Sequence, residues 1–364
     1  MKRFFTLFST FVAVFTIIAI SVNAQSQKKV LIEENTGAWC QFCPDGAVQV
    51  NNLMNLYPGL VYTTAIHNGD GMVNPSSSAI ESAFPPTGFP AGMVDRVSWP
   101  GQSNVPVSRT QWGSYTVQRL LGTTPVNVSM NAVYDATTRL STVTVTANFT
   151  GAASGNMKIN LFYSENKVTG TGSGFNQSNA YNNSAGHPYY QAGNPIVGFE
   201  HDHVLRYTAG PVHGVTGIIP STVTAGSTYS NTFTYTLPAN FDESNMKIIG
   251  VIIGDDNSIM NVEEGNLSGF TSIKDEVNLS IGNLYPNPAS NFVTVEYNLK
   301  NSSNVELKIY NALGQVVSTL KDKHEAAGNH TETFDLNLTK GMYFLNINTD
   351  QATFTRKLNI VTSE

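Results

Sequence analysis

The chain has two cysteines, and they lie three positions apart in the segment Trp39-Cys40-Gln41-Phe42-Cys43-Pro44. An apolar strand is expected before this segment and a helix after it. A helix N-terminus favours negative charge, so it lowers the pKa of a thiol placed there. This spacing and placement are typical of thiol–disulfide exchange, with Cys40 as the attacking thiolate and Cys43 as the resolving thiol.

The residues around the cysteines predict a β-α-β unit. The apolar run Val30-Leu31-Ile32 indicates a buried strand from Lys29 to Glu34. Pro44 favours the first turn of a helix, where its missing N–H costs nothing, and apolar residues continue at helical spacing to Leu56. A second strand is predicted from Leu60 to Ile66, which places the cysteines at the first strand-to-helix junction.

Glu34 lies six residues before Cys40 and is a candidate for proton transfer at this site. A carboxyl group in an apolar pocket has a raised pKa and could exchange a proton with Cys43. Because side chains alternate along a strand, at most one of Glu33 and Glu34 is expected to point inward. The alternative is that Glu34, or its neighbour, is a solvated charge at the strand end.

A proline-rich segment farther along the chain ends in Gly88-Phe89-Pro90. The predicted order here, a helix over 76–84, a strand over 91–97 and a helix over 108–121, resembles the thioredoxin superfamily. In that superfamily a cis-proline loop faces the cysteines just before a strand. The resemblance implies a cis bond before Pro90. We expect the neighbouring aromatic residues Trp39, Phe42 and Phe89 to contact substrate. A trans proline in a plain loop is the alternative.

Metal binding is the competing use of a Cys-x-x-Cys motif. A structural zinc site needs two more ligands, but the chain has no further cysteine and His67 follows a separate strand. We therefore expect no metal at the cysteines and no cofactor. A weaker metal candidate is the pair His201 and His203, which would share one face of a strand. A polar strand edge is the alternative interpretation.

Residues 124–264 alternate between apolar and polar side chains in short runs separated by polar turns. This pattern predicts an all-β sandwich domain. Within it, the segment from Thr169 to Gln191 is rich in Gly, Ser, Asn and Tyr. We expect this segment to be a long loop that could form a binding rim.

The N-terminus predicts export. Met1-Lys2-Arg3 is basic, the residues from Phe4 to Val22 are apolar or small, and Val22-Asn23-Ala24 fits a cleavage site, so residues 1–24 form a predicted signal peptide. A membrane anchor is the alternative. Because Lys2 and Arg3 leave with the peptide, its removal changes the formal net charge from −6 to −8. A mildly acidic chain without a basic patch makes nucleic acid a poor partner.

One possible disulfide in an exported chain of 364 residues favours a reactive role for the pair. Export places the cysteines in an oxidising compartment, where disulfides persist. The loop that the pair would close is so short that the chain-entropy gain is only about 2 kcal/mol. A chain of this length has an ample core, so that gain is a weak structural reason for the pair.

Residues 283–364 predict a small β-sandwich, because short alternating strands are separated by Gly, Asn and Pro turns. This segment resembles the type IX secretion C-terminal sorting domain. The motifs that carry the resemblance are Tyr285-Pro286-Asn287-Pro288, Ile309-Tyr310-Asn311-Ala312-Leu313-Gly314, Gly341-Met342-Tyr343-Phe344 and Lys357-Leu358-Asn359-Ile360. The resemblance implies an Ig-like sandwich that partners the type IX secretion machinery. Such a domain is usually cleaved, leaving the cargo released or attached to surface lipopolysaccharide. An ordinary binding sandwich is the alternative.

Residues 28–264 resemble the outer-membrane-protein-28-like family of exported proteins. The residues that carry this resemblance are Val30-Leu31-Ile32-Glu33-Glu34, Gly37-Ala38-Trp39-Cys40, Cys43-Pro44, Ala65-Ile66-His67, Gly88-Phe89-Pro90, Asp95-Arg96 and His201-Asp202-His203-Val204-Leu205-Arg206. The resemblance implies an α/β thioredoxin-like domain over 28–123, followed by the β-sandwich over 124–264. A linker over 265–282 would then lead to the Ig-like sorting domain over 283–364. The expected location is secreted or on the outer-membrane surface, after passage through the periplasm.

The sequence therefore predicts an exported thiol–disulfide oxidoreductase or isomerase-like protein that acts on protein thiols or disulfides. The alternative is a non-enzymatic surface adhesion or binding protein in which the cysteine pair is a structural disulfide. The environment of the pair distinguishes the two hypotheses. An exposed Cys40 beside a cis Phe89–Pro90 bond favours exchange, and a fully buried pair favours a structural disulfide.

Overall fold

The computed structural model describes residues 25–268, 279–350 and 353–361. The predicted signal peptide and much of the predicted linker therefore lie outside the described residues. Within the described ranges, no helix combines the length and apolar character that a membrane span needs. Most regular structure in these ranges is β-strand, with three α-helices and one short 3-10 helix.

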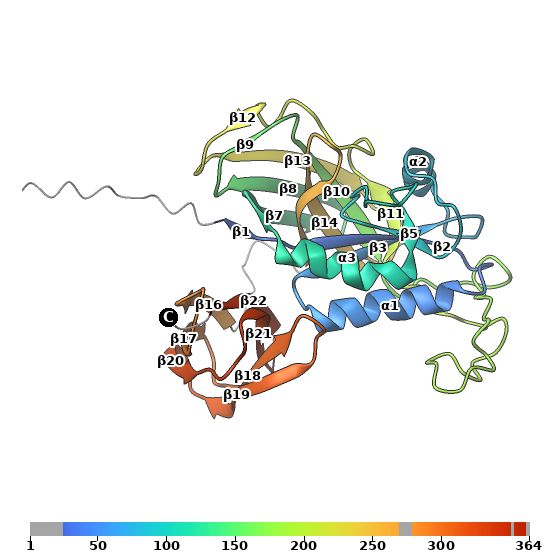
Figure 1. The fold of residues 1–364 in the computed structure, drawn as a ribbon. Helices are drawn as coiled ribbons and strands as arrows, with labels where there is room; N and C mark the ends of the chain where they lie inside the picture. The colour runs from blue at the N-terminus through green and yellow to red at the C-terminus, as the bar shows by residue number, and fades with distance from the viewer. Residues whose placement is uncertain (1–24, 269–278, 351–352, 362–364) are drawn as a thin grey trace, which may run out of the picture.

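An eight-stranded mixed sheet forms the centre of the molecule (Figure 1). Its strand order is β15 (Ile259–Asn266), β14 (Met246–Ile253), β10 (Lys158–Glu165), β11 (Val204–Thr208), β3 (Val61–His67), β2 (Val30–Thr36), β4 (Ala91–Val94) and β5 (Val107–Ser108). The strands β2 and β3 are parallel, whereas β4 and β5 pair antiparallel. In the order β11, β10, β14 and β15, each strand pairs antiparallel with the next. The two groups join where Val204 pairs in parallel with Ala65.

The predicted fold class, an α/β thioredoxin-like domain with a separate all-β sandwich, is wrong. Strands from both predicted segments belong to one sheet, because β11 pairs directly with β3. The described residues form several β-sheets with few helices. Alternation of apolar residues indicates where strands lie, but the neighbour of a strand depends on contacts between distant segments, which alternation does not record.

Helices cover both faces of the sheet around β2. The helices α1 (Cys43–Leu56) and α3 (Arg109–Leu121) pack on the face that carries Val30, and they lie side by side in Figure 1. The helix α2 (Pro75–Ala83) packs on the opposite face, which carries Leu31. Because both faces are covered, every residue of β2 is buried.

The helices and strands predicted in this region are confirmed to within two residues at each end, with one exception. The strand predicted over 91–97 is shorter, since β4 ends at Val94. The next two residues, Asp95 and Arg96, have φ angles of 53° and 54°. Such left-handed backbone cannot continue a strand, so the chain turns there.

A three-stranded sheet packs against the second half of the central sheet. Alternate residues of its middle strand, such as Val143, join a common core with Ile159 of β10. Its order is β13 (Thr228–Thr236), β8 (Leu140–Phe149) and β7 (Val126–Asp135). Short pairs are formed by β1 (Ser26–Gln27) with β6 (Thr123–Thr124) and by β9 (Ala153–Ser154) with β12 (Thr222–Val223), and the 3-10 helix is Glu243–Asn245.

The C-terminal part of the chain forms two further antiparallel sheets around their own core. It contacts the C-terminal end of α1, where the Tyr57 hydroxyl donates to the Ala312 carbonyl at 2.7 Å (Figure 1). One sheet contains β16 (Leu279–Tyr285), β17 (Phe292–Leu299) and β20 (Gly328–Asp335). The other contains β19 (Val316–Glu325), β18 (Ser303–Asn311), β21 (Gly341–Thr349) and β22 (Thr353–Ile360).

Candidate functional site

Cys40 and Cys43 form a disulfide at the N-terminal end of α1, with their Cα atoms 5.4 Å apart. The turn between them is closed by the Cys43 amide, which donates to the Cys40 carbonyl at 3.2 Å. Both residues are almost fully covered, because Cys40 is 4% and Cys43 is 2% exposed. By the criterion derived from the sequence, this burial favours a structural disulfide.

The Phe89–Pro90 bond is cis, as the resemblance to the thioredoxin superfamily implies, and not trans as in the alternative. Pro90 is buried against the first turn of α1 beside the disulfide. Gly46 permits this approach, because a Cβ atom there would lie 3.1 Å from Pro90 Cβ and would clash with Glu34 Oε1. A glycine at this helical position therefore brings Glu34, Pro90 and the start of α1 together.

Glu34 is buried on the face of the sheet that α1 covers, and only 4% of it is exposed. Its Oε1 atom has no hydrogen-bond partner among the described residues. Burial raises the pKa of Glu34 to about 8, while the nearby Arg109 opposes the increase and Asp45 adds to it. The carboxyl group is therefore mostly protonated at neutral pH.

A cavity of about 30 Å³ lies between Glu34 and Cys43, and both residues line it. Such a polar cavity has room for one water molecule. His67 and His201 also line it, with ring centroids 5.3 Å apart. The other lining residues are Thr36, Ala47, Ala65, Gln177, Phe199 and Asp202.

A buried histidine–aspartate pair connects this cavity to the cysteine loop. His67 Nδ1 donates to Asp70 Oδ2 at 2.7 Å, and the Ala38 amide donates to the same oxygen at 2.8 Å. Burial alone would raise the pKa of Asp70, but these hydrogen bonds and one from the Met72 amide outweigh it and lower the pKa. An ionised Asp70 thus fixes both the His67 ring and the backbone two residues before Cys40.

The expectation that only one of two neighbouring glutamates points inward is wrong. Glu33 is fully buried on the opposite face of β2, where Arg96 binds both of its carboxylate oxygens at 2.7 and 2.6 Å. Alternation does place Glu33 and Glu34 on opposite faces, as expected. Both are buried because helices cover each face, so neither is a solvated strand-end charge.

An open groove of about 540 Å³ lies over Cys40. Trp39 and Phe42 stand beside it and are 49% and 45% exposed. Phe89 contacts Trp39 edge to face, with ring centroids 5.3 Å apart. The structure therefore places all three aromatic candidates around one opening; the remaining lining residues are Gln41, Gly88, Ser178 and Asn194.

Residues 166–203, which connect β10 to β11, form a long segment that we call the insert. Sequence reasoning identified part of it as a loop but gave no reason to place it at the cysteines. The Gln177 side chain donates to the Cys40 carbonyl at 2.9 Å. The Ser178 and Ala180 amides donate to the Ala38 and Gln41 carbonyls, each at 2.8 Å. The insert is thus fixed to the cysteine loop by hydrogen bonds to three of its carbonyl groups.

The two metal candidates, His201 and His203, do not lie on a common strand face. Both precede β11, and His203 has a φ of 59°, so strand alternation does not apply to them. Burial lowers the pKa of His201 to about 4, and its Nε2–H donates to the Phe175 carbonyl at 2.8 Å. Burial also lowers the pKa of His203 to about 4; the Asp202 charge opposes this decrease, and the Lys247 charge adds to it.

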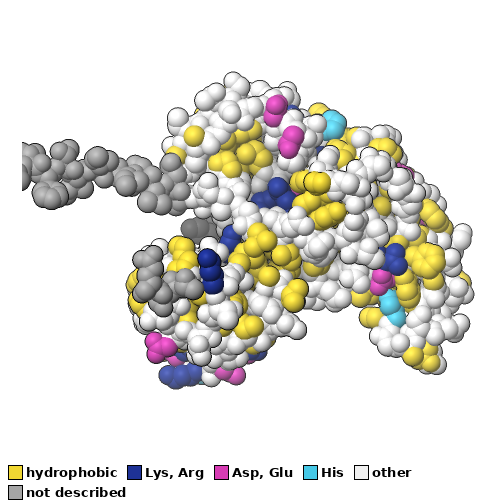
Figure 2. Space-filling view, in the orientation of Figure 1, with side chains coloured by type: hydrophobic (Ala, Val, Ile, Leu, Met, Phe, Trp, Pro, Cys, Tyr) yellow, Lys and Arg dark blue, Asp and Glu magenta, His cyan; other side chains and the backbone are white. Residues whose placement is uncertain are grey.

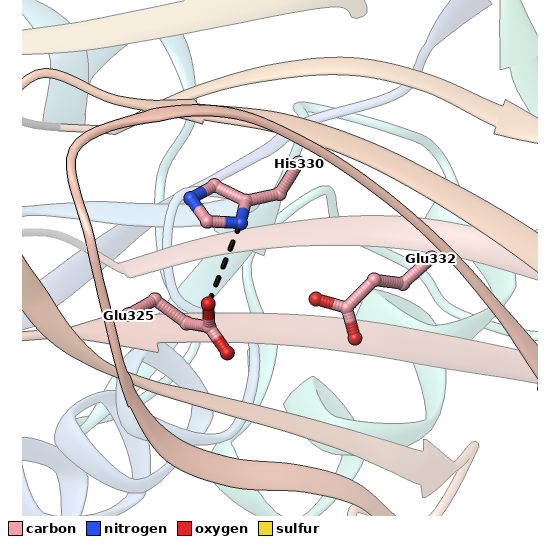
Figure 3. Close-up of side chains that lie close together, drawn as sticks. All are labelled: Glu325, His330 and Glu332. Atoms are coloured by element: carbon pink, nitrogen blue, oxygen red, sulfur yellow. Dashed lines mark ion pairs between the residues drawn. The ribbon is translucent and has the colours of Figure 1, made fainter.

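Glu325, His330 and Glu332 form the one group of three potential metal ligands found in the described residues (Figure 3). The Lys321 ammonium group already lies between the two carboxylates, 2.7 Å from Glu325 Oε1 and in contact with Glu332. His330 Nδ1 is 3.5 Å from Glu325. We interpret the group as an ion-pair network that joins β19 to β20, because a lysine occupies the place of a cation.

Comparison with protein families identifies two parts of the chain. The outer membrane protein Omp28 model matches residues 77–268, which is more than half of the sequence. The chain belongs to the Omp28 family. The secretion system C-terminal sorting domain model matches residues 283–361 of this Omp28-family protein. These matches confirm the predicted export to the outer membrane or cell surface, and they imply interaction with the type IX secretion machinery. Neither match supports the thioredoxin-like domain.

Among solved structures, HBP35 of Porphyromonas gingivalis is similar to this Omp28-family protein with a TM-score of 0.52 and 18% identity. The match covers 92% of this chain and 99% of that chain, so the likeness extends over the whole fold. Dimeric latent PorU from the same organism matches with a TM-score of 0.23 and 13% identity, over 66% of this chain and 20% of that one. A search of curated protein sequences finds no significant match.

Proposed function

We propose that this Omp28-family protein is an exported thiol–disulfide exchange protein whose reactive pair is Cys40 and Cys43. The observation that carries the proposal is the buried carboxyl group of Glu34, whose Oε1 atom has no hydrogen-bond partner among the described residues and which lines the same cavity as Cys43. Burying a carboxyl group in this way destabilises the fold. A purely structural disulfide has no use for such a group, whereas exchange needs a proton donor and acceptor.

Exchange from the oxidised state proceeds in two steps. A substrate thiolate attacks Cys40 Sγ and forms a mixed disulfide, and Cys43 leaves as a thiolate that takes a proton from Glu34. A second substrate thiolate then attacks the substrate sulfur and releases the Cys40 thiolate. The substrate loses two electrons and gains a disulfide, and the cysteine pair is reduced. The reverse sequence reduces a substrate disulfide, with Glu34 as the base that deprotonates Cys43.

The groove supports the proposal by giving a substrate a place to bind at Cys40. The small exposed part of Cys40 lies in this groove, next to the exposed rings of Trp39 and Phe42. Exposed aromatic rings offer a large contact area at a low cost in conformational entropy. A peptide segment that packs on these rings would bring its own cysteine to Cys40.

The second candidate function is a non-enzymatic surface binding or adhesion protein in which the disulfide only holds the first turn of α1 in place. The low exposure of Cys40 and Cys43, 4% and 2%, favours this alternative. In that case the binding groove would act without the cysteines, and the unpaired carboxyl group of Glu34 would have no role.

The reduction potential of the pair tests the two functions. The mature chain from Gln25 is equilibrated with thiol buffers of known potential, and the free thiols are trapped and counted. A potential between about −270 and −120 mV is the range of exchange catalysts and supports the proposal. A potential below about −300 mV is typical of structural disulfides and would favour the binding protein.

A further inference from the structure

The insert does more than cover the cysteine loop, since it supplies part of the groove over Cys40. Ser178 and Asn194 of the insert line this groove together with the cysteine loop and with Gly88 and Phe89. Figure 1 shows the insert, in yellow-green, at the N-terminal end of α1, far from the sorting domain. The groove is therefore bounded by three separate segments and is not a flat surface around the cysteines.

Asn179 holds the insert in the shape that places Ser178 and Asn194 in the groove. This residue is 1% exposed, and its side-chain amide donates to the Tyr189 and Gly193 carbonyls at 3.0 and 2.9 Å. Its backbone N–H donates to Asn194 Oδ1 at 2.9 Å. The groove wall is thus fixed by hydrogen bonds within the insert before any ligand arrives, which lowers the entropy lost on binding.

The insert is also attached to the helices beside the disulfide. Arg109 of α3 binds Asp45 of α1 and donates to the Tyr181 hydroxyl at 2.9 Å. The Tyr181 ring stacks on His187 at 4.0 Å between centroids and meets Phe42 edge to face. These contacts make the wall continuous with the scaffold that carries the cysteines.

Two polar groups of the wall have free hydrogen-bonding capacity. The Ser178 hydroxyl and the Asn194 side-chain NH₂ group have no protein partner among the described residues. Both can donate to a carbonyl oxygen. The other side of the groove is aromatic, and no described residue that lines it carries a charge. A charged ligand group would therefore lose its hydration without gaining an opposite charge.

We propose that the insert makes this groove a binding site for an extended, uncharged polypeptide segment, with Ser178 and Asn194 as the residues that select it. In an extended chain, side chains point alternately to opposite sides, so apolar side chains can lie on Trp39 and Phe89 while polar groups face the insert. The fate of a cysteine within that segment rests on the proposed function. The binding step does not, so it can be tested without any thiol chemistry.

The test uses a nine-residue peptide in which leucines alternate with asparagines and a serine stands at the centre in place of cysteine. Titration calorimetry measures its affinity for the oxidised mature chain. A second peptide, in which lysines replace the leucines, tests the requirement for uncharged side chains. The variant Ser178→Phe fills the groove, and Ser184→Phe is its matched control, because Ser184 is an exposed residue of the same insert that does not line the groove.

We expect the leucine peptide to bind, and Ser178→Phe to weaken its binding by about tenfold, or about 1.4 kcal/mol. Ser184→Phe should bind as tightly as the unmodified chain. The milder variant Ser178→Ala should also weaken binding, even if Ser178→Phe fails to fold. Equal affinity for the lysine peptide, unchanged binding by both Ser178 variants, or no binding to the unmodified chain would overturn the inference. A structural-range potential together with peptide binding would refute only the proposed exchange function.

Discussion

Replacing Glu34 with glutamine should stabilise the protein, by an amount that grows with pH. The Glu34 carboxyl group is buried, its Oε1 atom has no hydrogen-bond partner in the part of the chain that the structure describes, and burial raises its pKa from 4.5 to about 8. In the unfolded chain the group ionises at its ordinary value. Between these two pKa values the folded protein keeps a proton that the unfolded chain has already released.

The sign and size of the change in stability follow from this difference in bound protons between the folded and unfolded chains. Because the folded pKa is raised, the free energy of unfolding should fall as the pH rises from 4.5 to about 8, and the group has no effect at lower pH. At pH 7 the unfolded group is fully ionised and the folded group is mostly protonated. At 1.36 kcal/mol per pKa unit, the group then destabilises the fold by about 3 kcal/mol. Glutamine has nearly the same shape as glutamate and does not titrate, so Glu34→Gln removes this pH-dependent destabilisation.

The assay is urea unfolding of the oxidised mature chain at pH 5 and pH 7, followed by intrinsic tryptophan fluorescence, to which the fully buried Trp112 contributes. The free energy of unfolding of Glu34→Gln should exceed that of the unmodified chain by about 1 kcal/mol at pH 5 and by about 3 kcal/mol at pH 7. Glu200→Gln, which changes an exposed glutamate, is the control and should have no such pH-dependent effect. If Glu34→Gln gives the same difference at both pH values, the carboxyl group does not titrate as we infer.

Three further predictions test the surroundings of the site. Gly46→Ala should destabilise the protein by about 1–3 kcal/mol in thermal unfolding, because the added methyl group overpacks the site. Gly113→Ala is the control and should be neutral or stabilising, because a Cβ atom at Gly113 would have a single neighbour, at 4.0 Å. Equal effects of the two substitutions would refute the close packing at Gly46. Glu33→Gln should lower stability by about 3–5 kcal/mol, because it leaves the buried Arg96 charge unpaired; a loss below about 1 kcal/mol would contradict this. Cys43→Ser should accumulate a mixed disulfide with oxidised glutathione, detected by mass spectrometry, because the resolving thiol is missing; an inert free thiol would support the structural disulfide.

The local elements at the cysteines could be predicted because their signals are short-range. The proline after Cys43 and the helical spacing up to Leu56 predicted α1, which extends from Cys43 to Leu56. The sorting domain and the Omp28 resemblance were confirmed for a related reason, since each depends on motifs that can be read in order along the chain. Burial of both Glu33 and Glu34 could not be predicted, because it requires knowing that each face of β2 is covered.

The insert shows most clearly where sequence reasoning stopped. Its composition predicted a long loop, and the structure does contain one between β10 and β11. Nothing in that composition indicates that Gln177 donates to the Cys40 carbonyl, or that Ser178 and Asn194 line the groove. Side-chain amides and hydroxyls can bond to any carbonyl within reach, so their partners are set only when distant segments come together.

The sequence by itself determined the candidate reactive pair and the export of the protein: two cysteines three positions apart at the start of a helix, and a C-terminal sorting domain. These features depend on residue types at short spacing, which the chain fixes directly. Tertiary structure decided that strands from two predicted domains share one sheet, and that Glu34 is buried beside the same small cavity as Cys43. The pairing of β3 with β11 and the burial of Glu34 depend on long-range packing, and many distant contacts must act together to produce them.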